Sequence, residues 1–365
     1  MTNNPEMQIR GKKLQLPAFL PDATSGYVRA VDSRDLESVR IQALVMNTFH
    51  LMQKPGSSTI QAFNGLHQFA DWHGAIVTDS GGFQAYSLIH QSDQFGTLSD
   101  RGIIFRPEGK DRKFILSPEK SIQLQISYDS DIVICLDDCT HVDAPRDEQE
   151  SSVKRTLDWA VRCKKEYDHQ IDQRQIDKDR RPLIFAVIQG GGYPDLRRKC
   201  AEGLLEIGFD GFGYGGWPLD AQGNLLTEIV ALTRELVPDE YPMHALGIGH
   251  PVNLMKTYRL GYEIFDCALP TRDARHGRLM RYLEPPTTPL RGEGWLEYVY
   301  IQDKKYIKDS RGISEYCDCP VCTHYSIGYL HHLFKTGDWL YHRLATLHNL
   351  RFMTQLTQRL RSHDG

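Results

Sequence analysis

Residues 131–138 have the sequence Asp-Ile-Val-Ile-Cys-Leu-Asp-Asp, and residues 183–189 have the sequence Leu-Ile-Phe-Ala-Val-Ile-Gln. Both are continuous apolar runs without polar alternation, which is typical of parallel strands that are covered on both faces. Each run ends in polar residues. Six further runs of this kind lie at residues 18–22, 43–47, 75–79, 211–216, 243–249 and 262–266.

Amphipathic segments lie between these runs. Ser117 and Pro118 suit the N-cap and first position of a helix, and residues 147–169 and 193–208 show helical patterning. Eight runs alternating with helices predict an α/β fold of the (β/α)8 TIM barrel type. A doubly wound sheet is the alternative, although no G-x-G-x-x-G follows the first run. We interpret residues 168–181 as a charged surface loop.

The pattern breaks after the eighth run. Residues 272–335 are rich in Arg, Pro and Tyr, and residues 295–301 predict a small sheet. A helical pattern from residue 338 to about residue 361 closes the chain. We therefore divide the chain into a barrel of residues 1–271 plus 336–365 and an insertion of residues 272–335. The insertion lies between the last strand and the last helix.

The composition is ordinary for a globular protein, with 40% hydrophobic and 25% charged residues among 365, and it excludes disordered, collagen-like and coiled-coil classes. No run approaches the roughly 18 apolar residues of a membrane helix, and the first residues are polar. We expect a cytoplasmic protein without membrane contact. The net charge is −4, yet residues 272–365 hold 14 Lys and Arg against 10 Asp and Glu. This basic segment suits a polyanionic partner, although ordinary surface scatter explains the charge equally well.

Three cysteines, Cys317, Cys319 and Cys322, fall within six residues. In a chain without a secretory signal such a cluster favours a metal site over a disulfide framework, and free clustered thiols would be prone to oxidation. A closed tetrahedral zinc site needs a fourth ligand. We favour His348 on the closing helix, which would make one structural Zn²⁺ per chain. The spacing alone leaves four competitors open, His324, His331, His332 and His342.

Carboxylates follow several of the predicted strands. In a barrel the carboxyl ends of the strands line the active site, and these ends carry Asp79, Asp137, Asp138 and Asp266. Converging carboxylates suit acid–base and covalent chemistry at a sugar carbon. Any single Asp is equally a helix cap, an interpretation that fits Asp138 better than Asp79 or Asp266. Glycine-rich strand ends leave room for a flat ligand near the backbone.

Recognisable motifs occur in a fixed order from about residue 18 to the C-terminus. They are Asn47-Thr-Phe-His-Leu51, Asp79-Ser-Gly-Gly-Phe-Gln84, Ser117-Pro-Glu-Lys120, Ile188-Gln-Gly190, Phe265-Asp-Cys-Ala-Leu-Pro-Thr-Arg272, Cys317-x-Cys-x₂-Cys322, Tyr329-Leu-His-His-Leu333 and Leu347-His-Asn-Leu350. Together these motifs resemble the tRNA-guanine transglycosylase (queuine tRNA-ribosyltransferase) family.

The resemblance implies a pentosyltransferase with a zinc-bearing barrel fold. Its catalytic barrel would be residues 1–271 plus 336–365, and its insertion, residues 272–335, would bind zinc and contact RNA. It would exchange guanine at wobble position 34 of tRNAs with a GUN anticodon for a 7-deazaguanine base such as preQ1 or queuine. Asp266 matches the nucleophile that forms a covalent ribosyl intermediate, and Asp79 matches the general base. Two displacements give net retention, as in retaining glycosidases.

The resemblance also assigns binding residues. The base would meet Asp137 and Gln189 at its hydrogen-bonding edge and stack on Phe83, and the same pocket would include Ser80, Gly81, Gly82, Gly216 and Trp217. The RNA-contacting segments correspond to Gly247, Ile248, Gly249, His250, Pro251, Val252 and Asn253, and to Thr271, Arg272, Asp273, Ala274 and Arg275. The family commonly forms homodimers, so a homodimer is expected.

Three departures from the family pattern bear on specificity. Trp217-Pro-Leu-Asp220 replaces the usual Leu-Ala-Val-Gly, at a strand end that reads the 7-substituent. Asp138 stands where Glu is usual, and Thr271-Arg-Asp-Ala-Arg-His-Gly277 replaces Thr-Arg-Asn-Ala-Arg-Asn-Gly. Two alternative functions therefore stand beside the first: a paralogue that inserts a deazaguanine into DNA, and a non-catalytic RNA-binding subunit. The second requires damaged catalytic positions, which this sequence does not have.

Overall fold

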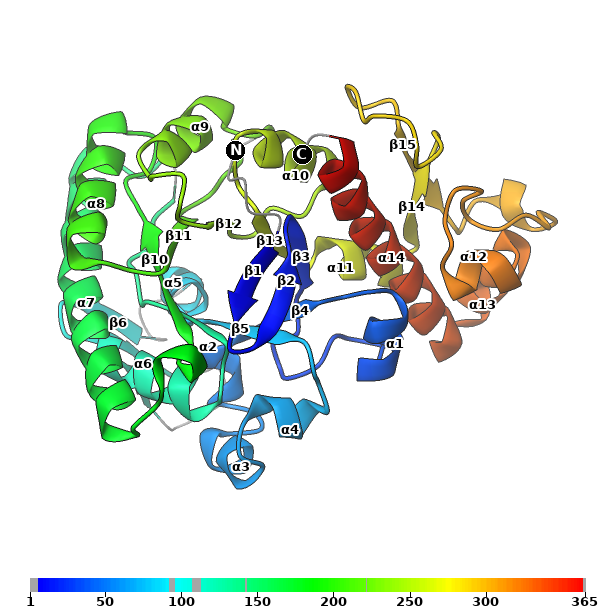
Figure 1. The fold of residues 1–365 in the computed structure, drawn as a ribbon. Coiled ribbons are helices and arrows are strands. Elements are labelled where there is room, and N and C mark those ends of the chain that lie inside the picture. Colours follow the sequence, from blue (N-terminus) through cyan, green and yellow to red (C-terminus); the bar gives the residue numbers. More distant parts are fainter. Residues whose placement is uncertain (1–5, 92–95, 107–112, 142, 221, 364–365) are drawn as a thin grey trace.

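The computed structural model describes residues 6–91, 96–106, 113–141, 143–220 and 222–363, and its centre is an eight-stranded parallel barrel (Figure 1). In spatial order the strands are β3 (Ala18–Pro21), β13 (Ile264–Cys267), β12 (Met243–Ala245), β11 (Gly211–Tyr214), β10 (Leu183–Ile188), β9 (Ile132–Ile134), β5 (Ala75–Asp79) and β4 (Ala43–Asn47). A parallel bridge between Asp22 and Val45 links the two end strands and closes the barrel. The predicted TIM barrel and all eight of its strands are confirmed.

Helices cover the outside of the barrel because each carries one apolar stripe. Ser117 caps the helix after it as predicted, since its hydroxyl accepts a hydrogen bond from the Lys120 N–H. The helices that follow barrel strands are α1 (Ser33–Ser38), α2 (Thr48–Leu51), α3 (Ser57–Ala62), α4 (Leu66–Ala70), α5 (Gly82–Gln91), α6 (Pro118–Ser127), α7 (Arg146–Gln173), α8 (Pro194–Ile207), α9 (Thr227–Glu235) and α10 (Pro251–Arg259).

The interpretation of residues 168–181 as a loop is wrong in part. Helix α7 continues to Gln173, and η2 (Lys178–Arg180) is a 3₁₀ turn. Pairs four residues apart stabilise the extension: Lys164 binds Asp168 at 2.7 Å, and Gln170 donates to Glu166 at 2.9 Å.

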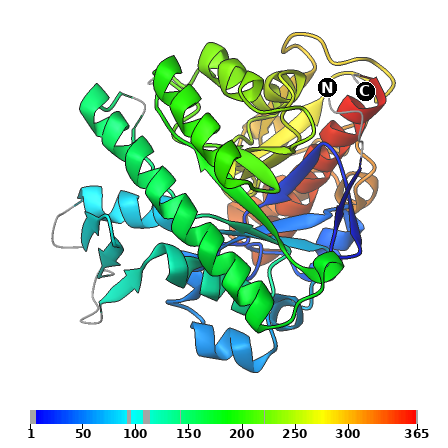
Figure 2. The ribbon, with the colours of Figure 1, turned by 60° about the vertical axis from the view of Figure 1, so that its left-hand side comes forward.

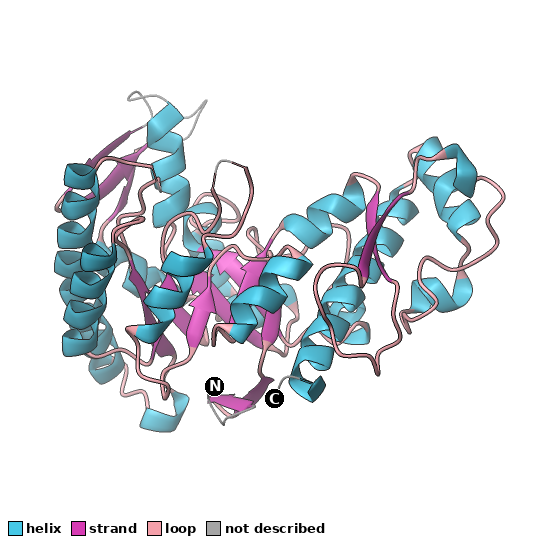
Figure 3. Ribbon diagram, turned by 90° about the horizontal axis from the view of Figure 1, so that it is seen from above, coloured by secondary structure: helices cyan, strands magenta, loops and turns pink. Residues whose placement is uncertain are grey.

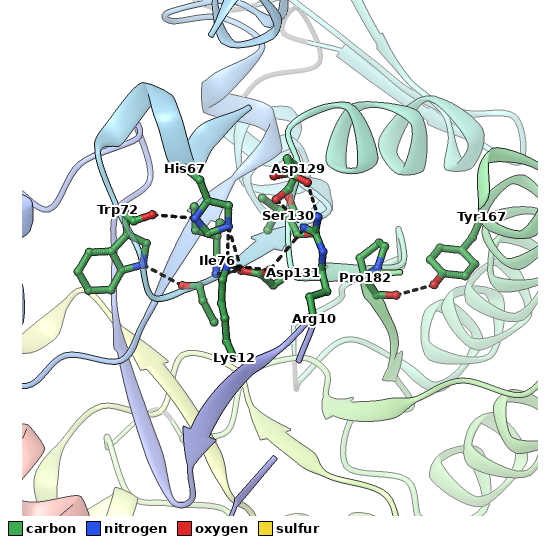
Figure 4. Close-up of polar contacts among 12 residues, drawn as sticks. Arg10, Lys12, His67, Trp72, Ile76, Asp129, Ser130, Asp131, Tyr167 and Pro182 are labelled. Carbon is green, nitrogen blue, oxygen red and sulfur yellow. Dashed lines mark hydrogen bonds and ion pairs between the residues drawn. The ribbon is translucent and has the colours of Figure 1, made fainter. Parts of the chain in front are cut away.

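An N-terminal hairpin covers the amino ends of the strands. Its two strands are β1 (Glu6–Ile9) and β2 (Lys12–Gln15). Asp131, just before β9, is fully buried and receives Lys12 Nζ at 2.7 Å and His67 Nε2 at 3.0 Å (Figure 4). Burial raises the pKa of Asp131, but the hydrogen bond from His67 and the charge of Lys12 hold it below the ordinary value. The hairpin is therefore fixed to the barrel by a buried ion-pair cluster.

The opposite, carboxyl end of the barrel is the open one. An antiparallel sheet of β6 (Gly96–Ser99), β7 (Gly102–Phe105) and β8 (Phe114–Leu116) follows α5. Figure 3 shows this small sheet at the upper side of the barrel and the N-terminal hairpin at the lower side. The carboxyl ends of the strands are thus left free for a ligand.

A second lobe lies beside the barrel, on the far side of the closing helix α14 (Trp339–His363) (Figures 1 and 2). It confirms the predicted small sheet, which pairs β14 (Arg278–Tyr282) with β15 (Leu296–Tyr300). This lobe also holds η3 (Lys304–Tyr306), α12 (Pro320–His324) and α13 (Ile327–Thr336), whereas α11 (Leu269–Arg275) lies on the barrel side of α14 (Figure 1). The exact division at residues 272 and 335 stays a prediction. Among the described residues, no helix combines the length and apolar character that a membrane span requires.

Candidate active site and metal centre

A cavity of about 430 Å³ opens at the carboxyl ends of the barrel strands. All three of Asp79 in β5, Asp266 in β13 and Asp137 in the segment after β9 line it. So do most of the predicted base-binding residues: Ser80, Gly81, Gly82, Phe83, Gly216 and Trp217. The strand ends therefore bring together residues that lie up to 187 positions apart in the sequence.

Asp79 ends strand β5 and pairs in register with Asn47 of β4. The Asn47 amide Nδ2 donates to Asp79 Oδ2 at 3.5 Å. Burial, followed by the negative charge of Asp266, raises the pKa of Asp79 well above its ordinary value, and the Asn47 hydrogen bond opposes this only weakly. Two carboxylates in one cavity with unequal environments suit different roles, one holding a proton and the other not.

Asp266 is the last residue but one of strand β13, and its Oδ1 accepts two hydrogen bonds. The Nε2 of His244 lies 2.8 Å away and the backbone N–H of Gly247 lies 3.1 Å away. His244 is 1% exposed and comes from the neighbouring strand β12. Sequence reasoning missed His244, because a single His in an apolar strand gives no signal until its partner is known.

Asp137 lines the cavity and pairs with Gln189, which is fully buried and is not among the lining residues. Gln189 Nε2 donates to Asp137 Oδ2 at 2.6 Å, and within the described residues the buried Gln189 Oε1 has no hydrogen-bond partner. Burial raises the pKa of Asp137 to about 7, with the Gln189 hydrogen bond acting in the opposite direction. Gly215 permits this packing, because a Cβ there would lie 2.5 Å from Gln189 Nε2. A carboxylate beside an amide offers both acceptors and donors to a flat heterocycle.

Aromatic side chains form the rim of the cavity. Phe83 and Trp217 meet edge to face with centroids 5.6 Å apart, and His141 lies 5.8 Å from the Trp217 ring. About two fifths of Phe83 and of Trp217 is exposed. This rim offers stacking surface at the mouth of the cavity. Asp138, by contrast, is buried and pairs with Arg155.

The two segments predicted to contact RNA lie along the same mouth. Gly247, Ile248, Gly249, His250 and Asn253 line the cavity, whereas Pro251 and Val252 are buried in the first turn of α10.

Arg272 also lines the cavity, while Thr271, Asp273 and Ala274 are buried in α11, where Asp273 pairs with Arg278. Burial, together with the charges of Arg29 and Arg272, lowers the pKa of Arg275, and its Nη1 has no hydrogen-bond partner among the described residues. Arg272 is exposed and Arg275 is half-buried, and neighbouring guanidinium groups that repel one another and keep a spare N–H suit an anionic ligand.

The cysteine cluster gathers around the closing helix. The Sγ atoms of Cys317, Cys319 and Cys322 lie 3.8, 3.6 and 3.3 Å from Nδ1 of His348, and all four ligand atoms lie within 4.8 Å of one another. These separations match the ligand spacing of tetrahedral zinc, about 3.5–3.8 Å for bonds of about 2.3 and 2.1 Å. Three thiolates and one imidazole are the donor set that zinc prefers in structural sites.

The second nitrogen of His348 fixes which atom is free to bind a metal. His348 Nε2 lies 2.6 Å from the carbonyl oxygen of Met280 in β14, so Nε2 carries the proton and Nδ1 presents its lone pair to the cluster. His331, one of the competing histidines, is used elsewhere, because its Nδ1 contacts the Ile301 carbonyl oxygen at 2.7 Å. The structure therefore places His348, rather than a competing histidine, with the three cysteines, which the spacing alone did not decide.

The chain is similar to known proteins over nearly its whole length. A sequence model of the family described as "Queuine tRNA-ribosyltransferase" matches residues 5–363. The chain is 36% identical to proteins of that name from a Psychrobacter species, from Acinetobacter baylyi and from Tolumonas auensis. These alignments cover 96%, 95% and 95% of this chain and 86%, 84% and 87% of the relatives.

Proposed function

The chain belongs to the queuine tRNA-ribosyltransferase family, a family of transferases, and from that premise we propose that it exchanges guanine at position 34 of GUN-anticodon tRNAs for a 7-deazaguanine base. The observation that carries the proposal is the convergence of Asp79, Asp137 and Asp266 on one cavity. The relatives' names support tRNA as the substrate.

The first displacement uses Asp266 as the nucleophile. One of its carboxylate oxygens bonds to C1′ of guanosine 34 while the C1′–N9 bond breaks, and the electron pair leaves with guanine. Asp79 supplies the proton that neutralises the departing base, a role that its raised pKa favours.

The second displacement reverses these roles. Asp79, now a carboxylate, takes the proton from the incoming base, whose nitrogen then attacks C1′ and expels Asp266. Both aspartates return to their starting states, and the configuration at C1′ is retained overall. One N-glycosidic bond replaces another, so no nucleotide triphosphate is needed.

Recognition divides between the base and the polynucleotide. Asp137 and Gln189 bind the base edge, Phe83 and Trp217 stack at the rim, and the target nucleotide leaves its stack to enter the cavity. An open anticodon loop makes that step inexpensive. Arg272 and Arg275, with the segment Gly247 to Asn253, bind the backbone phosphates.

The partners complete the proposal. We infer one Zn²⁺ per chain, held by Cys317, Cys319, Cys322 and His348, whose role is structural because the four ligands leave no open position. A homodimer and a cytoplasmic location follow from the family resemblance. The Trp217 segment, at the rim of the cavity, is the part of the protein that most directly affects selectivity for the 7-substituent of the base.

Release of radiolabelled guanine from a GUN-anticodon tRNA tests the proposal. The expected result is the release of one guanine for each 7-deazaguanine base incorporated, and continued release depends on adding that base. A parallel arm with duplex DNA tests the alternative polymer, which the altered Trp217 segment motivates. Turnover on DNA alone would replace tRNA as the substrate, and absence of release from both polymers would leave the non-catalytic reading.

The affinity for free base is expected to fall at acidic pH because Asp137 titrates near pH 7. The carboxylate accepts two N–H donors from the base edge, whereas the protonated acid accepts fewer. The dissociation constant for guanine should rise about tenfold per pH unit below pH 7 and level off above it. Equilibrium binding measured from pH 5.5 to 8.5 checks this, with Asp137→Asn as the variant that should remove the pH dependence. A flat profile for the wild type would contradict it.

A further inference from the structure

His244 is a buried polar residue that contacts the reacting carboxylate. It lies in the middle of β12 and is 1% exposed. Its Nε2 is 2.8 Å from Asp266 Oδ1, and its Nδ1 is buried without a hydrogen-bond partner in the described part of the chain. Burying an imidazole nitrogen without a hydrogen-bond partner costs free energy of folding, so the position of His244 needs an explanation.

The contact fixes the tautomer of His244. A nitrogen 2.8 Å from a carboxylate oxygen donates a proton to it, so Nε2 carries hydrogen. The Nδ1 atom has no hydrogen-bond partner among the described residues, so Asp266 is the contact that orients the ring. His244 is therefore a fixed donor aimed at Asp266.

Both hydrogen bonds to Asp266 converge on the same oxygen. The His244 ring and the Gly247 N–H each donate to Oδ1, at 2.8 and 3.1 Å. Among the described residues no donor contacts Oδ2, and Asp266 lines the cavity. The two oxygens thus differ, one held by the protein and one left for the ligand.

We propose that His244 is a positioning residue that locks the Asp266 carboxylate through Oδ1, so that Oδ2 is the oxygen that attacks C1′. This inference rests on the proposed function, in which Asp266 is the nucleophile. Gly247 alone cannot hold the carboxylate plane, because one donor leaves rotation about the Oδ1 contact free, whereas two donors from different directions restrict it.

The same donors act in the second displacement. In the covalent intermediate Oδ1 is the carbonyl oxygen of an ester, and hydrogen bonds to a full carboxylate are stronger than bonds to an ester carbonyl. When the C1′–Oδ2 bond breaks, negative charge returns to the carboxylate, and the hydrogen bonds from His244 and Gly247 to Oδ1 become stronger. His244 therefore orients the Asp266 carboxylate in the first displacement and favours its release from C1′ in the second.

A matched pair of substitutions tests the inference. His244→Gln places an amide N–H near the position of Nε2, whereas His244→Met has similar length without a donor. We expect His244→Met to lower kcat about 10- to 100-fold with little change in the KM for tRNA, and His244→Gln to restore most of that loss. The covalent adduct of the Met variant should also decay more slowly when free base is added.

The outcomes separate this inference from the proposed function. Exchange by the wild type, with equal kcat values for the Met and Gln variants, would overturn the role of His244 and leave the proposed function standing. Lack of exchange by the wild type would overturn both. If His244→Met does not fold, His244→Asn serves in its place, because its shorter amide does not reach Asp266, and a kcat equal to that of His244→Gln would count against the inference.

Discussion

Asp266→Asn is expected to lower the rate of base exchange by about 10⁴-fold or more, the loss typical of removing a catalytic nucleophile. An amide is a poor nucleophile at a sugar carbon, so no covalent intermediate forms. The substitution keeps the shape of the side chain, and the amide oxygen can still accept the hydrogen bonds of His244 and Gly247. The effect should therefore fall on chemistry and leave the fold intact.

Guanine release and a covalent enzyme–RNA adduct on denaturing gels measure this effect. Asp195→Asn is the matched control, since it removes an exposed carboxylate that pairs with Arg146 and does not line the cavity. The control should exchange at the wild-type rate. An adduct that persists in Asp266→Asn would show that another residue attacks C1′. Equal tRNA affinity for both variants would confirm that binding is unchanged.

The barrel could be predicted from the sequence because its strands are buried on both faces. Runs such as residues 131–138 and 183–189 have no polar alternation, and eight of them in alternation with helices fit few folds. Carboxylates at their ends then predicted the cavity. The N-terminal hairpin and the sheet of β6, β7 and β8 were not predicted, because strands of three or four residues carry too little periodicity.

Two features of the site could not be predicted from the sequence, because they depend on how distant segments pack together. His244 and Asp266 are 22 positions apart, and only the pairing of β12 with β13 brings them together. His348 was one of five candidate imidazoles, and it is selected because α14 packs its ring between the cysteines and the Met280 carbonyl. The extension of α7 was missed for another reason: its last turn is charged on the exposed side and depends on local pairs.

Cys319→Ala is expected to abolish zinc binding and to lower the free energy of unfolding by several kcal/mol. Zinc binding at such sites contributes about 10–16 kcal/mol in isolated peptides, which is comparable to the whole stability of a domain. Here the four ligands connect α12 and the chain before it to α14, and His348 connects α14 to β14. Helix α14 also carries Asn349, whose amide donates to the Pro270 carbonyl in α11.

That connection extends the effect to the active site, because α11 carries Arg272 and Arg275 immediately after the strand of Asp266. Loss of the metal should therefore weaken tRNA binding as well as stability. Metal content by mass spectrometry and thermal unfolding check this, with Cys163→Ala as the control. Cys163 and Cys319 are both buried, so both variants lose the same atoms from packed surroundings, and only one loses a ligand. The control should cost about 1 kcal/mol and keep one zinc per chain. Equal zinc content and equal melting temperatures for the two variants would contradict a structural metal at this cluster.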